Sequence, residues 1–289
     1  MKRHALTDTV TIHTHACGEG GIFVNAYLVE TPKALVAVDA TLSESESRAF
    51  RAEADQIGKP LEAVLITHPH PDHVAGITNL VAGLSPKIVA TQPVIDLMRR
   101  LEEPKRQQWT PVFGAEWVQR WTYPNTVVAS GDALTIDGVR YAVLDVGPGG
   151  DAEANAVWFI EAPRRTAFFG DLTFDGTHSY AADGHVLAWL ANLSLLERMC
   201  AGMEVVFPGH GAAAAPGALL RAQAAYLTTL ASHVKELAHG RTELGPAEKQ
   251  ELERRMTAYL PNAGLSFLIA MNADPVAREL NGYRSPAAP

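Results

Sequence analysis

Cysteine is scarce in this chain, whose 289 residues include only Cys17 and Cys200. Two thiols are too few for the disulfide framework that stabilises many small secreted domains. Neither cysteine lies in a recognisable motif, so we interpret both as structural residues. We therefore expect a soluble protein in a reducing, cytoplasmic setting.

Long hydrophobic runs and an excess of basic residues are also lacking. No stretch is apolar for long enough to cross a bilayer, and the basic start at residues 1–4 is not followed by the apolar run of a signal peptide. The 24 Lys and Arg residues are outnumbered by 32 Asp and Glu residues, which gives a net charge of -8. Nucleic-acid binding rests on clustered Lys and Arg. We therefore expect a small-molecule substrate, with neither a membrane nor nucleic acid as a partner.

The composition does provide a core, because 47% of the residues are hydrophobic and 19% are charged. Apolar or alternating stretches predict strands, and amphipathic stretches predict helices. Strands are expected at residues 7–15, 22–30, 33–40, 61–66, 87–91, 126–129, 133–136, 139–146, 155–161, 166–169 and 203–207. Helices are expected at residues 43–57, 73–83, 92–103, 186–200, 216–239 and 246–260. This order predicts two packed sheets with helices outside, in preference to a doubly wound sheet.

The chain is expected to divide near residue 215. Residues 1–215 would form the domain with the two sheets, and residues 216–289 a C-terminal helical extension packed on that domain. The apolar stretch at residues 265–271 indicates packing against the body of the protein. The extension could form part of the wall of a cleft or a homodimer contact.

Three histidines and an aspartate gather in residues 67–73, with the sequence THPHPDH. This stretch follows an apolar run of strand length and precedes the start of a helix. Its two prolines keep His68 and His70 extended, so that alternate side chains point the same way. Asp72 and His73 then turn into the helix and reach a second point nearby. The pattern predicts a metal site.

Two further residues of metal-binding type come directly after short apolar stretches. Residues 166–170 lead to Asp171, and residues 204–209 lead to His210. In open sheets, ligands gather beyond the carboxyl ends of strands, where several loops converge. We therefore expect Asp171 and His210 to join the histidine cluster.

The order His-x-His-x-Asp-His, then Gly170-Asp171, then Pro208-Gly209-His210-Gly211 resembles the metallo-β-lactamase superfamily over about residues 20–212. The resemblance implies an α+β fold, a four-layer αβ/βα sandwich, with two divalent metal ions between its sheets. Zinc is the first choice of metal, with manganese or iron as alternatives. By the resemblance, His68 and His70 hold the first metal, and Asp171 bridges both. The second metal is then held by Asp72, His73 and His210.

One position departs from the family pattern. The family usually has another histidine in a Pro-Gly-His turn, where this chain has Gly150. Counting back from the following strand puts Glu153 at the ligand position, and Asp151 is the second choice. A third alternative is that neither coordinates a metal. A carboxylate here would weaken the Lewis acidity of the metal and favour harder ions such as manganese or iron.

The resemblance implies a hydrolase in which a metal-bound hydroxide attacks a small ester, lactone or related substrate. Asp72 would also orient the nucleophile. His178 and Tyr180 could donate a proton to the leaving group or cap the following helix. Two alternatives are a mononuclear iron dioxygenase of thiols or persulfides with the same fold, and a binding or regulatory protein with an impaired metal site.

Two groups of side chains remain open between a structural and a functional role. His13 and His15 form an i, i+2 pair that could bind metal, although an exposed strand face is the favoured reading. A set of aromatic residues falls in the irregular region expected at residues 107–126 and belongs either to the core or to an apolar wall for substrate. This set comprises Trp109, Phe113, Trp117, Trp121 and Tyr123.

Overall fold

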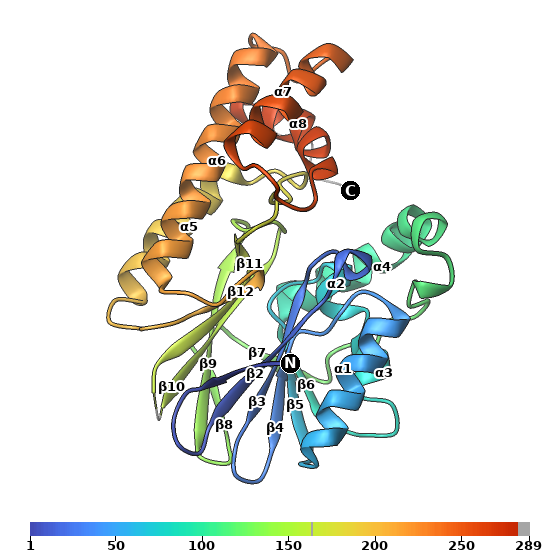
Figure 1. Ribbon diagram of the computed structural model, residues 1–289, viewed down its shortest axis with the longest axis vertical. Helices are drawn as coiled ribbons and strands as arrows, with labels where there is room; N and C mark the ends of the chain where they lie inside the picture. The colour runs from blue at the N-terminus through green and yellow to red at the C-terminus, as the bar shows by residue number, and fades with distance from the viewer. Residues whose placement is uncertain (163, 283–289) are drawn as a thin grey trace.

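A computed structural model describes residues 1–162 and 164–282. Two sheets pack face to face, and helices cover the outer side of each sheet (Figure 1). This is the expected αβ/βα sandwich. Among the described residues, no helix has both the length and the apolar character needed to span a membrane.

The first sheet has seven strands in sequence order. They are β1 (Lys2–Ala5), β2 (Thr11–Ala16), β3 (Asn25–Glu30), β4 (Leu35–Val38), β5 (Leu61–Leu65), β6 (Lys87–Thr91) and β7 (Thr126–Val128). The pairs from β1 to β4 are antiparallel, and the pairs from β4 to β7 are parallel. Strand β1 was not expected, because its residues are polar and mostly exposed at the edge of the sheet.

The second sheet has five strands in the order β12-β11-β10-β9-β8. They are β8 (Ala133–Ile136), β9 (Val139–Gly147), β10 (Asn155–Ala162), β11 (Thr166–Phe174) and β12 (Phe207–His210). Only β11 and β12 are parallel, with Phe168 opposite Phe207. This pairing starts β12 at the residue where the expected strand 203–207 was to end. As a result, the carboxyl end of β12 lies beside that of β11.

Helices α1 (Glu44–Ile57), α2 (Pro71–Val74), α3 (Ile77–Leu80) and α4 (Gln92–Phe113) accompany the first sheet. The Ser43 hydroxyl accepts a hydrogen bond from the Glu46 amide at 3.2 Å and caps α1. The single helix expected at residues 73–83 is instead two short helices, α2 and α3. Between them, Gly76 lies so close to Thr41 that a Cβ atom would come within 2.6 Å of its carbonyl oxygen.

The expectation that residues 107–126 are irregular was partly wrong, because α4 continues to Phe113. Pro104 and Pro111 lie inside this helix and each lacks an amide hydrogen. The carbonyl groups that lose their partners belong to Arg100 and Gln107, which are exposed and accessible to water. A surface helix can therefore tolerate both prolines here.

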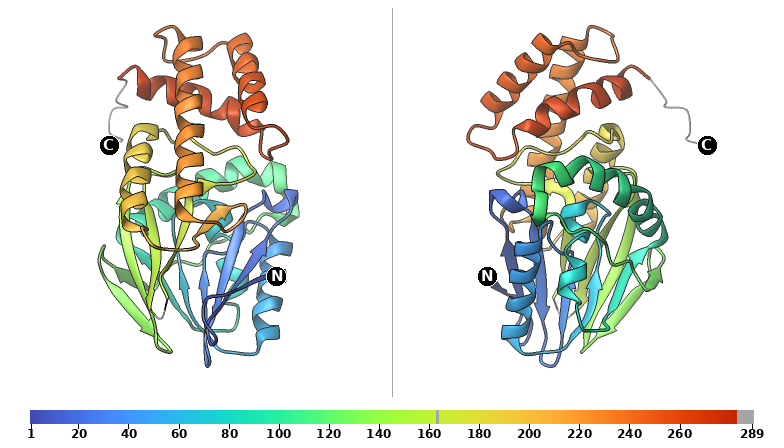
Figure 2. Two further views of the ribbon diagram at one scale, coloured as in Figure 1. Left: turned by 60° about the vertical axis from the view of Figure 1, so that its left-hand side comes forward. Right: turned by 90° about the vertical axis from the view of Figure 1, so that its right-hand side faces the viewer.

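The second sheet is covered by α5 (Val186–Met199) and α6 (Pro216–Ala238), and α7 (Pro246–Tyr259) and α8 (Phe267–Leu280) pack against α6. Figure 2 shows the long helix α6 running from the side of the sheet to α7 and α8 at one end of the molecule. Leu227 of α6, Leu252 of α7 and Ile269 of α8 are fully buried in one hydrophobic cluster with Phe169 and Leu172 of β11. The described part of the C-terminal segment therefore shares a core with the second sheet. Residues 283–289 of the expected extension lie outside the described residues.

Because this core is shared, Ile269→Ala should destabilise the whole protein rather than α8 alone. We expect one cooperative unfolding transition, with a loss of about 2–5 kcal/mol for a buried isoleucine. Urea unfolding followed by far-UV circular dichroism and tryptophan fluorescence measures both quantities. Val127→Ala, at an exposed position, is the control. Two separate transitions, with only one shifted, would show that the C-terminal helices fold as an independent unit.

Candidate metal centre

The histidine-rich loop follows β5 and is almost completely buried. His68, His70 and His73 are at most 5% exposed, and Asp72 is 6% exposed. His70 has the extended backbone of a helix N-cap, and Pro71 occupies the first turn of α2. Consequently His68 and His70 leave the strand as an extended pair, whereas Asp72 and His73 lie in the first helical turn.

Asp171 in β11 and His210 at the end of β12 reach the same place from the second sheet. Gly209 allows this approach, because a Cβ atom there would lie 1.8 Å from the Asp171 carboxylate. Asn25 donates to the carbonyl oxygens of Pro208 and Gly211 at 3.2 and 2.8 Å, and the Tyr27 hydroxyl also donates to Pro208. Strand β3 therefore fixes the turn that carries His210.

Four of these side chains form what we call the second cluster, namely Asp72, His73, Asp171 and His210. His73 Nε2 lies 3.2 Å from Asp171 Oδ1, and His210 Nε2 lies 3.3 Å from Asp171 Oδ2. His210 Nε2 is also 3.4 Å from Asp72 Oδ2. Two ligand atoms, each about 2.1 Å from one tetrahedral zinc ion, are themselves about 3.4 Å apart. The spacing of the second cluster therefore fits one shared cation.

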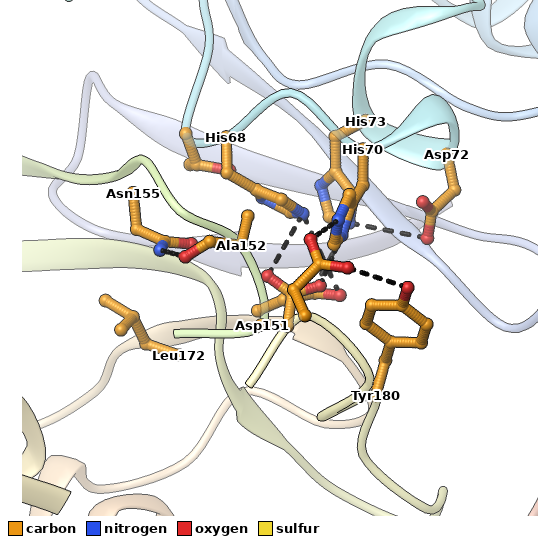
Figure 3. Close-up of polar contacts among 12 residues, drawn as sticks. His68, His70, Asp72, His73, Asp151, Ala152, Asn155, Leu172 and Tyr180 are labelled. Carbon is orange, nitrogen blue, oxygen red and sulfur yellow. Dashed lines mark hydrogen bonds and ion pairs between the residues drawn. The ribbon is translucent and has the colours of Figure 1, made fainter. Parts of the chain in front are cut away.

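His68, His70 and Asp151 form the first cluster. His70 Nδ1 is 2.6 Å from Asp151 Oδ2, and His68 Nε2 is 3.6 Å from Asp151 Oδ1. Asp171 Oδ2 lies 4.0 Å from His68 Nε2, so its carboxylate is between the two clusters. Figure 3 shows the histidines and Asp151 pointing toward a common region.

The structure corrects the preference for Glu153. Its side chain is half exposed and pairs with Arg100 at 2.6 Å, away from the histidines. Asp151, the second choice, is fully buried and contacts His70. The side-chain amide of Asn155 donates to the carbonyl oxygens of Gly147 and Ala152, and this closes the loop with Asp151 turned inward.

Gly150 itself has no room for the histidine of the family pattern. A Cβ atom at this position would come within 2.7 Å of the Asn155 side chain that closes the loop. The loop therefore presents its next residue, Asp151, to the cluster.

Residues behind the clusters orient the imidazoles. The carboxylate of Asp39 accepts hydrogen bonds from the Thr67 amide at 2.8 Å, the Thr67 hydroxyl at 2.6 Å and His73 Nδ1 at 2.8 Å. The Thr67 hydroxyl in turn lies 3.0 Å from His68 Nδ1 and accepts its proton. His68, which is neutral, therefore presents an unprotonated Nε2 to the clusters. The hydrogen bond from Nδ1 to Asp39 likewise turns Nε2 of His73 toward the clusters. Asp183 lies 3.3 Å from His70 Nε2 and leaves Nδ1 to face Asp151.

Burial and neighbouring charges shift the pKa values in the first cluster. Burial, reinforced by His73, holds the pKa of His68 well below its usual range and keeps it neutral. Burial by itself lowers the pKa of His70, but Asp151 and Asp183 outweigh it and raise the pKa to about 10. Burial also raises the pKa of Asp151 to about 7. Without a cation, the first cluster thus stores a proton between His70 and Asp151.

Buried polar atoms without hydrogen-bond partners are a second observation that fits a metal in the clusters. Within residues 1–162 and 164–282, five buried polar atoms of the cluster residues make no hydrogen bond, and these are His68 Nε2, His73 Nε2, Asp151 Oδ1, Asp171 Oδ1 and His210 Nδ1. Buried polar atoms are normally paired, because an unpaired one loses its hydration without compensation. A divalent cation in each cluster would satisfy the first four of these atoms and neutralise the buried carboxylates.

The two expected proton donors are placed differently. His178 Nδ1 lies 3.1 Å from the Tyr226 hydroxyl, and His178 does not line the cavity beside the clusters, so its proposed catalytic role is withdrawn. Tyr180 does line that cavity. Its ring packs edge-on against His70 with centroids 5.2 Å apart, and its hydroxyl donates to Asp183 at 2.9 Å.

The structure also shows where the histidine pair and the aromatic residues of the region 107–126 lie. His13 and His15 are buried and bind carboxylates, Glu30 at 2.7 Å and Glu53 at 2.7 Å, so they neither reach the clusters nor form an exposed face. Trp117 and Trp121 belong to the core between α1, α4 and the first sheet. Trp109 and Phe113 pack partly buried against the same core and also line the cavity. Tyr123 packs partly buried against this core as well.

Residues 20–210 match the family model of the metallo-beta-lactamase superfamily, and the chain belongs to this superfamily. Solved structures with the same fold include a metallo-beta-lactamase from Pontibacter korlensis, which is 19% identical in sequence. The match covers 78% of this chain and 98% of that chain, with a TM-score of 0.60. The metallo-beta-lactamase DIM-1 exposed to ceftazidime has 20% identity, coverage of 79% and 96%, and a TM-score of 0.61. At these identities the likeness concerns the fold alone.

Similar sequences match over shorter stretches. The uncharacterized protein YobT of Bacillus subtilis is 30% identical over 117 residues, 38% of this chain and 48% of that protein. A linear primary-alkylsulfatase of Pseudomonas is 39% identical over 56 residues, 19% of this chain and 11% of that protein. The exodeoxyribonuclease WalJ of Streptococcus pneumoniae is 39% identical over 62 residues, 22% of each. The chain thus spans about half the length of the first relative and far less of the others.

Asp183 was not anticipated from the sequence. It lies in the turn Ala182-Asp183-Gly184, 113 residues after His70 in the sequence. No local sequence pattern predicts its contact with the His70 ring. The contact of buried Asp39 with His73 also joins residues that are far apart in the sequence. The position of Asp39 at the end of β4, parallel to β5, was the available signal, because neighbouring parallel strands end side by side.

Replacing each candidate carboxylate tests the correction directly. Asp151→Ala should lose about one equivalent of bound metal, because it removes a ligand from the first cluster, whereas Glu153→Ala should retain the wild-type amount. Elemental analysis after zinc or manganese loading and exhaustive dialysis measures both. The exposed Glu153 variant serves as the matched control. Loss of metal from Glu153→Ala alone would reverse the assignment.

Asp39→Asn tests the orientation of His73 and His68. The amide has nearly the same shape but loses one acceptor oxygen, so His73 is no longer held in a single tautomer. We expect metal affinity to fall by about 10–100-fold with the fold retained. Competition with a chromophoric chelator measures the affinity, and circular dichroism checks the fold. Wild-type affinity in a folded variant would contradict the orienting role.

Proposed function

We propose that this chain is a metal-dependent hydrolase with a binuclear centre that cleaves a small ester, lactone or related substrate. The observation that carries the proposal is the pair of buried clusters, with the Asp171 carboxylate between them, beside an open cavity. Two divalent cations would supply Lewis acidity, lowering the pKa of water and polarising a carbonyl oxygen. The first cluster would hold one cation through His68, His70 and Asp151, and the second cluster would hold the other.

Two residues of the chain itself prepare the reaction. Asp72 stays ionised, because His73 and His210 outweigh its burial and lower its pKa to about 2. It lines the cavity, where an ionised carboxylate can accept a hydrogen bond from the attacking water. Tyr180 stays protonated, since burial and Asp183 raise its pKa, and it stands beside His70 at the cavity wall. Both are the catalytic residues of this proposal.

The local matches agree with hydrolysis as a class. The names of two relatives denote a sulfatase and a nuclease, and both matches are confined to about a fifth of this chain. An acidic chain with a net charge of -8 argues against a polyanionic substrate such as DNA. An uncharged ester or lactone is therefore the better choice for the substrate.

A second candidate is an iron-dependent dioxygenase acting on a thiol or persulfide. The first cluster favours it, because two histidines and one carboxylate are the ligand set of many non-haem iron oxygenases. Iron retained in preference to zinc or manganese, together with oxygen uptake on addition of a persulfide, would replace hydrolysis as the reaction.

His70→Ala tests the hydrolytic proposal. It removes a residue of the first cluster and the partner of Asp151, so hydrolysis of p-nitrophenyl esters and of lactones should fall to the rate of the buffer alone. A spectrophotometric assay with zinc- or manganese-loaded protein follows the reaction. Glu153→Ala, outside the clusters, should keep the wild-type rate. Full activity of His70→Ala would refute the mechanism.

A further inference from the structure

A cavity of about 370 Å³ opens beside the two clusters. His70, Asp72, Asp151, Asp171 and His210 contribute to its lining, so a molecule inside it touches the proposed metal centre. The charged residues of the lining outside the clusters are Glu19 and Lys105. The cavity is therefore polar where the reaction would take place and has few charges elsewhere.

Most of the remaining wall is hydrophobic, and six of its residues come from two distant parts of the chain. Trp109, Val112 and Phe113 lie in the last turns of α4, Leu265 lies just before α8, and Phe267 and Leu268 are the first residues of α8. We call these six residues the apolar wall. Figure 2 shows α8 and the end of α4 on the same side of the molecule. The C-terminal helices thus complete a cavity whose reactive end belongs to the two sheets.

The apolar wall continues from the buried clusters to solvent. Leu268 is 7% exposed, whereas Phe267 is 47% and Val112 is 66% exposed. Exposed hydrophobic side chains that line a cavity mark a surface meant to be covered by a ligand. Their side chains offer no hydrogen-bonding group except the Trp109 indole, so the wall suits neither a sugar nor a peptide backbone.

We propose that the apolar wall binds an aliphatic chain attached directly to the scissile group of the substrate. This inference rests on the proposed hydrolytic function and specifies its substrate class. The reactive group lies at the clusters, and the chain extends along Trp109 and Phe113 toward Val112 and Phe267 at the mouth. A flexible chain fits a wall that runs from a buried to an exposed position, since each added methylene buries further apolar surface.

A series of p-nitrophenyl esters from acetate to decanoate tests the chain dependence. For the metal-loaded protein, kcat/KM should rise by up to about fourfold for each methylene that reaches the wall, and level off once the chain extends past the mouth. Val112→Asp places a charge on the wall and should abolish the gain in kcat/KM for octanoate and decanoate relative to acetate. Phe267→Ala should reduce the gain in the same direction.

Val127→Asp is the matched control, because Val127 is 57% exposed on β7 and does not line the cavity. Equal losses in Val112→Asp and Val127→Asp, or equal kcat/KM for all chain lengths in the wild type, would overturn the inference. Comparing kcat/KM for ethyl octanoate and octyl acetate shows on which side of the scissile bond the aliphatic chain binds, because the first ester carries it on the acyl side and the second on the alcohol side. A preference for either supports the inference and assigns the chain to the acyl or the alcohol part.

Calorimetric binding of decanoate separates this inference from the proposed reaction. We expect binding with a negative heat-capacity change, weakened about tenfold or more in Val112→Asp but not in Val127→Asp. If this binding occurs and no ester is hydrolysed, the apolar wall stands and the proposed hydrolysis fails. If esters are hydrolysed without chain dependence and decanoate does not bind, hydrolysis stands and the inference about the wall fails.

Discussion

The structure depends on the burial of the Asp171 carboxylate among imidazoles at the meeting point of two sheets. His73 of the first sheet's loop and His210 of the second sheet both contact it, and His68 lies at 4.0 Å. A buried carboxylate without such partners would be costly. Holding them in place requires Gly209 to pass beside Asp171 and Asn25 and Tyr27 to bind the turn that carries His210.

The two sheets contribute to the centre in different ways. The first sheet supplies a preorganised loop, in which Asp39 and Thr67 orient the imidazole rings of His68 and His73. The second sheet supplies Asp171, His210 and the inward-facing Asp151. The C-terminal helices then add the hydrophobic side of the cavity through α8. The clusters thus lie between the two sheets, and the apolar wall beside them comes from α4 and from the segment that begins α8.

A carboxylate in the first cluster has chemical consequences. Replacing a neutral imidazole by Asp151 adds negative charge beside the proposed cation and reduces its Lewis acidity. Oxygen donors also favour harder metals. Asp151 is buried and hydrogen-bonded to His70 rather than exposed to solvent, so its carboxylate faces the place proposed for the cation. The choice of metal is therefore expected to influence activity more strongly than in a centre with histidines alone.

The sequence by itself determined the local part of the centre. In residues 67–73, two prolines and the start of α2 fix the directions of His68, His70, Asp72 and His73, because neighbouring residues and backbone sterics suffice. The choice between Asp151 and Glu153 was decided only by the tertiary structure. Both lie in one loop, and the direction of each depends on Asn155, which closes the loop, and on Arg100 in distant α4. The split of Trp109 and Phe113 from Trp117 and Trp121 likewise required α8 and the core to be in place, since periodicity cannot report which neighbour a face will meet.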